Sequence, residues 1–99
     1  MRMMMKVSIP VEAGNRGIKE GILPQTVIKF VEQMKPEACY FTPEDGKRTA
    51  LFFFDLADPT MLPSAVEPFF LNLNAGIEVS PVMNLDEMKA GVEKAMKTI

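Results

Sequence analysis

One pattern of eight residues occurs twice in this chain. Leu23-Pro24-x-x-Val27-x-x-Phe30 returns as Leu62-Pro63-x-x-Val66-x-x-Phe69, 39 residues further along. In each copy the apolar residues fall on one face of a helix, and the proline stands in the first turn, where its missing N–H costs nothing. A strand-like segment follows each copy after a similar gap. Two explanations of the pattern are open: duplication of a segment, or two helices that converged on the same apolar face because both pack on one sheet. Both explanations predict two strand–helix–strand halves.

Four segments have the composition of β-strands. They are Met5–Glu12, Ala38–Thr42, Thr49–Leu56 and Ile77–Met83. The first alternates apolar and polar residues, as a half-buried strand does, whereas Thr49–Leu56 is apolar on both faces, which is typical of a central strand. Asp45-Gly46 favours a two-residue hairpin turn between the second and third strands. The segment Gly14–Gly17 after the first strand predicts a flexible connection.

Three segments have helical patterns. The first is Leu23–Met34, and the second is Asp58–Leu73, which Pro63 and Pro68 split or kink. The third opens with Asn84-Leu85-Asp86-Glu87, which has the spacing of a capping box. We expect the two core helices to bury Val27, Phe30, Val31, Val66, Phe69 and Phe70. Right-handed crossovers then give an α+β fold with one antiparallel sheet and both core helices on one face.

The composition excludes several kinds of chemistry. The chain has no His, no Trp and one Cys. It therefore lacks an imidazole acid–base, a Ser-His or Cys-His nucleophile pair, an intrachain disulfide and the usual ligands of zinc, haem or iron–sulfur clusters. We expect no cofactor and no metal site. Cys39 lies in the middle of a predicted strand and is expected to be a buried, inert thiol.

The charge distribution argues against nucleic-acid and membrane partners. The chain has 11 Lys and Arg against 13 Asp and Glu, and no base lies between Thr49 and Leu85. A nucleic-acid surface needs a positive stripe that displaces counterions, and Lys47-Arg48 alone either grips an anion or is simply solvated. No apolar run approaches the roughly 18–20 residues of a membrane span, and no secretory signal is recognisable. We expect a soluble cytoplasmic protein.

The element order, the Asp45-Gly46 hairpin and the capped last helix together resemble the dimeric α+β barrel proteins, over about residues 5–97. The segments Lys35–Thr49, Val66–Phe70 and Pro81–Met83 also resemble a bacterial family of unassigned role. The resemblance implies a single ferredoxin-like βαββαβ domain over residues 1–99, with a four-stranded antiparallel sheet and an extra C-terminal helix. It also implies a homodimer whose two sheets face each other. Several enzymes of the superfamily use His or Trp, and this chain has neither. The resemblance therefore assigns no catalytic residue to this chain.

The sheet face that the helices leave uncovered is the candidate site. Strand parity places Lys6 and Ser8 on this face, beside Glu78 of the neighbouring last strand. The candidate ligand-binding residues are Lys6, Ser8, Tyr40, Asp55, Glu78 and Ser80. The third strand adds either Leu51, Phe53 and Asp55 or Ala50, Phe52 and Phe54. An apolar wall with a few polar groups is typical of small-ligand sites; the alternative is a dimer interface or a solvated face on which Lys6 and Glu78 merely pair.

Three functions are consistent with such a face. The one we favour is a small homodimer that holds a small apolar ligand between its two sheets and performs no chemistry. The second is a cofactor-independent isomerase or monooxygenase, with Tyr40 as proton donor and Glu78 or Asp55 as base. The third is a non-catalytic assembly module. A cavity in which Tyr40 meets a carboxylate would indicate the enzyme, and a closed, dry face would indicate the assembly module.

Overall fold

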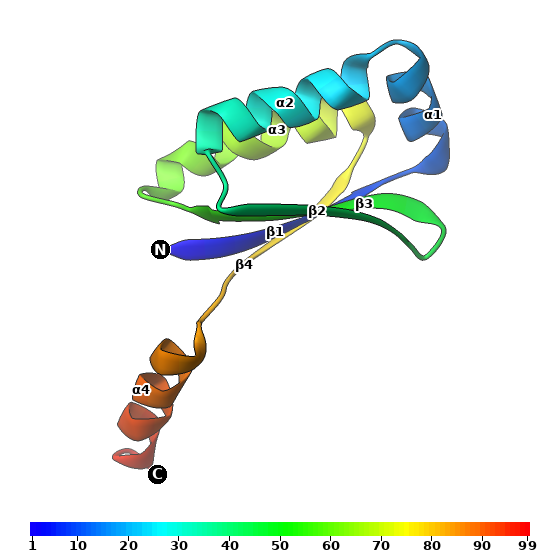
Figure 1. Cartoon of the computed structure of the whole chain (residues 1–99). Helices are drawn as coiled ribbons and strands as arrows, with labels where there is room; N and C mark the ends of the chain where they lie inside the picture. Colours follow the sequence, from blue (N-terminus) through cyan, green and yellow to red (C-terminus); the bar gives the residue numbers. More distant parts are fainter.

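A four-stranded antiparallel sheet with helices on both sides forms the architecture of the computed structural model, which describes residues 1–99. Its elements are β1 (Arg2–Ile9), α1 (Val11–Lys19), α2 (Ile22–Met34), β2 (Ala38–Glu44), β3 (Lys47–Asp55), a 3₁₀ turn η1 (Pro59–Met61), α3 (Leu62–Leu73), β4 (Gly76–Pro81) and α4 (Leu85–Met96). The strand order is β2-β3-β1-β4. Helices α2 and α3 cover one face of the sheet, and α4 projects from the other side (Figure 1). This α+β arrangement is compatible with a ferredoxin-like fold.

The hydrophobic core lies between the sheet and helices α2 and α3. Every second residue of β1 is buried on this side, namely Met3, Met5, Val7 and Ile9. Phe52 of β3 is fully buried there, and its ring centroid lies 4.5 Å from that of Phe30 in α2. Strand β1 begins at Arg2 rather than at the predicted Met5, because methionine side chains pack in the core as readily as aliphatic ones.

The glycine-rich segment after β1 is a helix, so the predicted flexible connection is wrong. Strand β1 ends at Ile9, and α1 begins at Val11 with Pro10 in the N-cap position. Gly14 and Gly17 are buried on one side of α1. A Cβ atom on Gly17 would lie 2.8 Å from Leu73 Cδ2 and 3.0 Å from Leu23 Cβ. These glycines therefore allow close packing of α1 and do not confer flexibility.

Gly17→Ala should lower the free energy of unfolding by about 1–3 kcal/mol, because crowding in a packed interior outweighs the gain in helix propensity. Gly91→Ala is the matched control, since a Cβ there meets nothing within 4 Å. The control substitution should leave stability unchanged or raise it by about 0.5–1 kcal/mol. Urea unfolding followed by circular dichroism gives both values. Equal effects of the two substitutions would mean that α1 does not pack as described.

The two core helices are rotated slightly from the predicted orientation. Helix α2 buries Thr26, Phe30 and Met34, so Val31, expected in the core, is 37% exposed. Burial of Thr26 is tolerated because its hydroxyl donates to the Ile22 carbonyl and accepts from the Asn72 amide. Helix α3 likewise buries Ala65, Phe69 and Leu73, which leaves Phe70 41% exposed. The predictions that Val31 and Phe70 are buried are therefore wrong.

The predicted hairpin turn forms, and Asp58 caps the short turn that precedes α3. Asp45 and Gly46 both have positive φ, 53° and 74°, as a two-residue hairpin turn requires. Asp58 accepts the Thr60 N–H at the start of η1, which lowers the pKa of its carboxyl, and α3 then begins just before Pro63. Strand β4 ends at Pro81, two residues before the predicted end at Met83. Strand β3 is central, as predicted, between β2 and β1.

Helix α4 stands apart from the rest of the molecule (Figure 1). Its capping box forms as predicted, yet all of its 12 residues are exposed. The radius of gyration is 15.8 Å, whereas a compact domain of this length has about 13 Å. The four apolar residues on one side of α4, Leu85, Met88, Val92 and Met96, are 42–65% exposed. None of the helices has the length and apolar composition needed to cross a membrane.

Candidate functional site

The uncovered face of the sheet is organised in rows that cross all four strands. The pairing register defines three of them: Ala38, Phe53, Met4 and Ser80; Tyr40, Leu51, Lys6 and Glu78; Thr42, Thr49, Ser8 and Gly76. Of the two predicted alternatives for the third strand, the set Leu51, Phe53 and Asp55 lies on this face. The set Ala50, Phe52 and Phe54 lies in the core.

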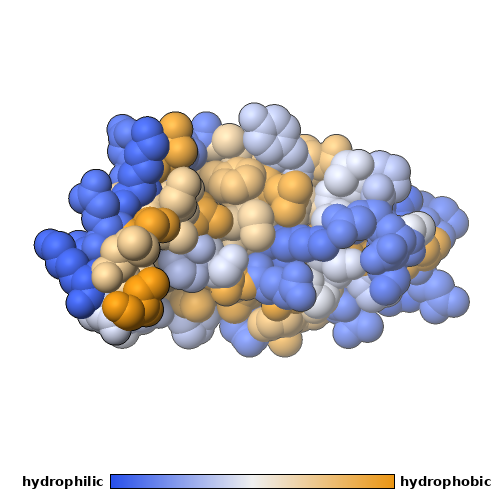
Figure 2. Space-filling view, turned by 90° about the horizontal axis from the view of Figure 1, so that it is seen from below, coloured by the Kyte–Doolittle hydropathy of each residue, from blue (hydrophilic) through white to orange (hydrophobic).

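Polarity changes along this face from one end to the other. The row that contains Phe53 and Met4 is mostly apolar and lies at the end from which α4 projects, whereas the row that contains Thr49 and Ser8 is polar and lies near the β2–β3 hairpin. Figure 2 shows this face, with hydrophobic residues on the inner flank of α4 and over the middle of the sheet, and hydrophilic ones toward the hairpin. A molecule that lies along the face would meet an apolar surface at one end and hydrogen-bonding groups at the other.

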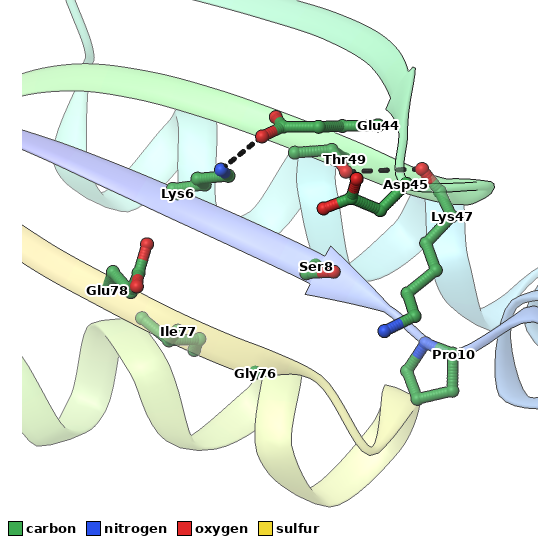
Figure 3. Close-up of a pocket in the computed structure, with 10 residues that line it drawn as sticks. All are labelled: Lys6, Ser8, Pro10, Glu44, Asp45, Lys47, Thr49, Gly76, Ile77 and Glu78. Atoms are coloured by element: carbon green, nitrogen blue, oxygen red, sulfur yellow. Dashed lines mark hydrogen bonds and ion pairs between the residues drawn. The ribbon is translucent and has the colours of Figure 1, made fainter.

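A hollow of about 470 Å³ occupies the polar end of the face (Figure 3). It is lined by Lys6, Ser8, Pro10, Glu44, Asp45, Lys47, Thr49, Gly76, Ile77 and Glu78. Strands β1 and β4 form its floor, and the β2–β3 hairpin forms one wall. The lining contains hydroxyls, carboxylates and two ammonium groups, so the hollow offers both hydrogen-bond donors and acceptors.

The Lys6 ammonium is the centre of charge in the hollow. It donates to Glu44 Oε1 at 2.5 Å, and this hydrogen bond, with the nearby charges of Glu44, Glu78 and Asp45, raises the pKa of Lys6 (Figure 3). Lys6 and Glu78 are register partners on neighbouring strands, as parity predicted. Lys6 nevertheless forms its ion pair with Glu44, because the end of the β2–β3 hairpin places the Glu44 carboxylate next to the Lys6 ammonium. Glu78 therefore has no salt-bridge partner.

The six predicted site residues all lie on the uncovered face, but the hollow brings only three of them together. Lys6, Ser8 and Glu78 line it. Tyr40 and Glu78 lie at opposite ends of one row, three strand spacings apart, or about 14 Å. Asp55 lies at the far end of β3, where its Oδ1 accepts from the N-terminal ammonium at 2.7 Å. Ser80 lies in the apolar row, outside the hollow.

Four polar lining residues were not among the predicted site residues, and all of them belong to the hairpin. They are Glu44, Asp45, Lys47 and Thr49. The Asp45-Gly46 turn predicted where the chain reverses. Strand parity alone does not tell how far the side chains of the hairpin reach over β1. The pairing register of β2 and β3 would have been the signal that places these four residues beside Lys6.

The start of α4 is fixed to the sheet by one carboxylate. Glu87 Oε1 accepts from the Asn84 backbone N–H at 2.9 Å and from Arg2 Nη1 at 2.6 Å. Arg2 also donates to Glu37, and its backbone carbonyl accepts from Val82 N–H. The Asn84 N–H and the Arg2 guanidinium hold the pKa of Glu87 below its usual range. Glu87 thus connects β1 to the first turn of α4.

Acid should loosen this connection. A carboxyl whose pKa is lowered in the folded state contributes its stabilisation above its ordinary pKa of about 4.3, and the contribution is lost as the pH falls through the lowered value. We expect amide exchange in the first turn of α4, corrected for intrinsic rates, to speed up below about pH 4. Glu87→Gln keeps an acceptor but cannot titrate, so its corrected exchange should vary less with pH. Identical pH profiles for the two proteins would contradict this role of Glu87.

The remaining candidate groups are in unreactive settings. Cys39 is half-buried on edge strand β2, and desolvation raises the pKa of its thiol, which disfavours the thiolate. No three His, Cys, Asp or Glu side chains gather in an arrangement that could hold a metal ion.

No protein-family model matches the chain, and no curated protein matches it.

Proposed function

We propose that this chain forms a cytoplasmic homodimer of the ferredoxin-like dimeric α+β barrel type, which holds a small molecule between its two sheets. The observation that carries the proposal is the uncovered sheet face, on which a polar hollow adjoins an apolar surface. Helix α4, with its apolar side exposed, projects from the same side of the sheet (Figures 1 and 2).

A second copy of the chain is the partner that fits both surfaces. An isolated helix of 12 residues is only marginally stable in water, so α4 gains most of its stability from packing. Each chain carries both an uncovered face and an α4, and a two-fold interface uses the same patch on both subunits. Pairing of two copies therefore covers both sheets and both helices at once.

The ligand that suits the resulting chamber is mainly apolar, with a polar end. Leu51, Phe53 and Met4 are half-buried in a single chain and offer the apolar surface. Glu78, which has no ion-pair partner, offers an acceptor to a ligand hydroxyl or amine in the hollow. This arrangement matches ordinary small-molecule sites, in which mostly apolar walls carry a few polar groups that fix orientation.

The enzyme alternative has less support than binding. Proton transfer needs donor and base within about 3 Å of the same substrate atoms. Tyr40 does not line the hollow, and it lies across the sheet from Glu78 in its own chain. Asp55 is engaged by the N-terminal ammonium. Neither predicted base is therefore paired with Tyr40 within one chain.

Titration with the fluorescent dye Nile red, an apolar molecule with a carbonyl end, tests the chamber. We expect blue-shifted emission on binding and at least a fivefold loss of affinity in Ser8→Trp, which fills the hollow, since small-molecule affinity depends on an open, shaped cavity. Ser64→Trp, on the exposed start of α3, is the control and should bind like the parent. Light scattering should give the same mass for all three proteins. Equal dye binding by Ser8→Trp would contradict the chamber and favour the assembly module.

A further inference from the structure

A second hollow, of about 360 Å³, lies on the opposite side of the sheet, between α2 and the β2–β3 hairpin. Its apolar lining residues are Ile9, Leu23, Val27, Phe41, Ala50 and Phe69. An apolar cavity of about 150 Å³ is enough to hold benzene. The hollow therefore has room for a ring with a short chain, and the between-sheet chamber makes no use of it.

One cation, Arg48, lies among the lining residues of this apolar hollow. Arg48 lies opposite Ile9 in the β1–β3 register and so on the helix side of the sheet. Its guanidinium takes part in none of the four salt bridges of the chain. Its only side-chain hydrogen bond runs from Nη2 to the neutral Asn15 Oδ1 at 3.1 Å. No carboxylate of the chain therefore pairs with Arg48, and most of its N–H groups have no hydrogen-bond partner within the chain.

Helix α1 holds the Arg48 side chain in place. A Cβ atom on Gly14 would lie 2.6 Å from Arg48 Nη1 and 3.3 Å from its Cδ. The Arg48 side chain thus lies against the α1 backbone, close to the place that a Cβ atom on Gly14 would occupy. Asn15, the next residue of α1, accepts the hydrogen bond without neutralising the charge. Two successive residues of α1 therefore orient a guanidinium that keeps its charge available.

We propose that this hollow binds a small apolar monocarboxylic acid, with its carboxylate on Arg48 and its hydrocarbon part between α2 and the hairpin. A planar guanidinium binds a carboxylate through two parallel charge-assisted hydrogen bonds, which neutral groups cannot reproduce. Apolar walls provide the remaining affinity by removing the hydrocarbon from water. The site lies within one chain and does not depend on the dimer or on the between-sheet chamber.

Calorimetric titration with 3-phenylpropionate tests the site. We expect the parent protein to bind the carboxylate at least tenfold more tightly than the neutral 3-phenylpropionamide, because the amide cannot form the charged pair. Arg48→Met should abolish this preference. Lys47→Met is the matched control: it removes the same charge from the adjacent residue, whose side chain lines the other hollow, and it should retain the preference.

Three results would overturn the assignment: no binding of 3-phenylpropionate by the parent, equal binding of acid and amide, or equal losses in the Lys47→Met and Arg48→Met proteins. The last would indicate a general effect of net charge. Ser8→Trp should leave this titration unchanged, because Ser8 lies on the other side of the sheet. A result that contradicts the between-sheet chamber can therefore be told apart from one that contradicts the Arg48 site.

Discussion

Phe52→Ala should lower the free energy of unfolding by about 3–5 kcal/mol, a large part of the 5–15 kcal/mol that holds a typical domain together. Phe52 is fully buried at the centre of the core. Its ring centroid lies 4.5 Å from that of Phe30, 5.9 Å from Phe41 and 6.0 Å from Phe69. Truncation removes these contacts and leaves a cavity that three rings from different elements cannot collapse to fill.

Phe70→Ala is the control for this prediction, because Phe70 is an aromatic residue adjacent to the core residue Phe69 and is 41% exposed. Its truncation should cost less than about 1.5 kcal/mol, since most of the lost surface was already in contact with water. Urea unfolding of both variants gives the comparison. A Phe70→Ala effect as large as that of Phe52→Ala would mean that α3 faces the sheet with its other side.

The second large effect is expected on the proposed dimer. Val92→Asp should weaken self-association at least about 100-fold, because it removes an apolar contact and places an unpaired carboxylate in the proposed interface, which together cost about 3 kcal/mol or more. Val92 lies on the apolar side of α4 with Met88 and Met96. Sedimentation equilibrium over a range of concentrations measures the change.

Ala90→Asp places the same charge in the middle of the same helix but near its opposite side, since successive residues turn by about 100°. It should change the dimer dissociation constant by less than about threefold, as an exposed substitution usually does. If Ala90→Asp weakened association as strongly as Val92→Asp, a general loss of helix stability would explain both results. The apolar side of α4 would then not be the contact surface.

Strand parity and turn chemistry were the parts of this fold that the sequence could predict. Alternation in β1 and β4 placed Lys6 and Glu78 on one face in neighbouring strands, and the register pairs them directly. The positive φ angles of the Asp45-Gly46 turn and the Asn84–Glu87 capping box follow from local residue preferences. Such features depend on a few neighbouring residues, so no knowledge of packing is required.

The features that the sequence did not predict depend on contacts between distant elements. Gly14 and Gly17 have the composition of a loop, and only the approach of Arg48 and Leu73 explains why glycine suits a helix there. Thr26 is buried in α2 whereas Val31 is exposed, and the Thr26 hydroxyl accepts a hydrogen bond from Asn72 of α3. Neither set of contacts can be inferred from residues that are neighbours in the sequence.

The same limit applies to the candidate site. Parity placed the six predicted residues on the uncovered face, but the partner of Lys6 is Glu44, which the hairpin brings over β1. The position of α4 was also beyond the sequence. The capping box predicted where the helix begins, whereas its apolar side is exposed in the single chain.

The central claim, that two uncovered sheet faces meet in the dimer, is tested most directly by the distance between copies of one spin label. A nitroxide at Ser8→Cys, in a Cys39→Ser background, lies on central strand β1 and on the uncovered face. Sheets packed face to face are about 10 Å apart, so pulsed electron spin resonance should give one intermolecular distance below about 30 Å. No intermolecular distance, or one above about 40 Å as expected for dimers joined through their helices, would contradict the account.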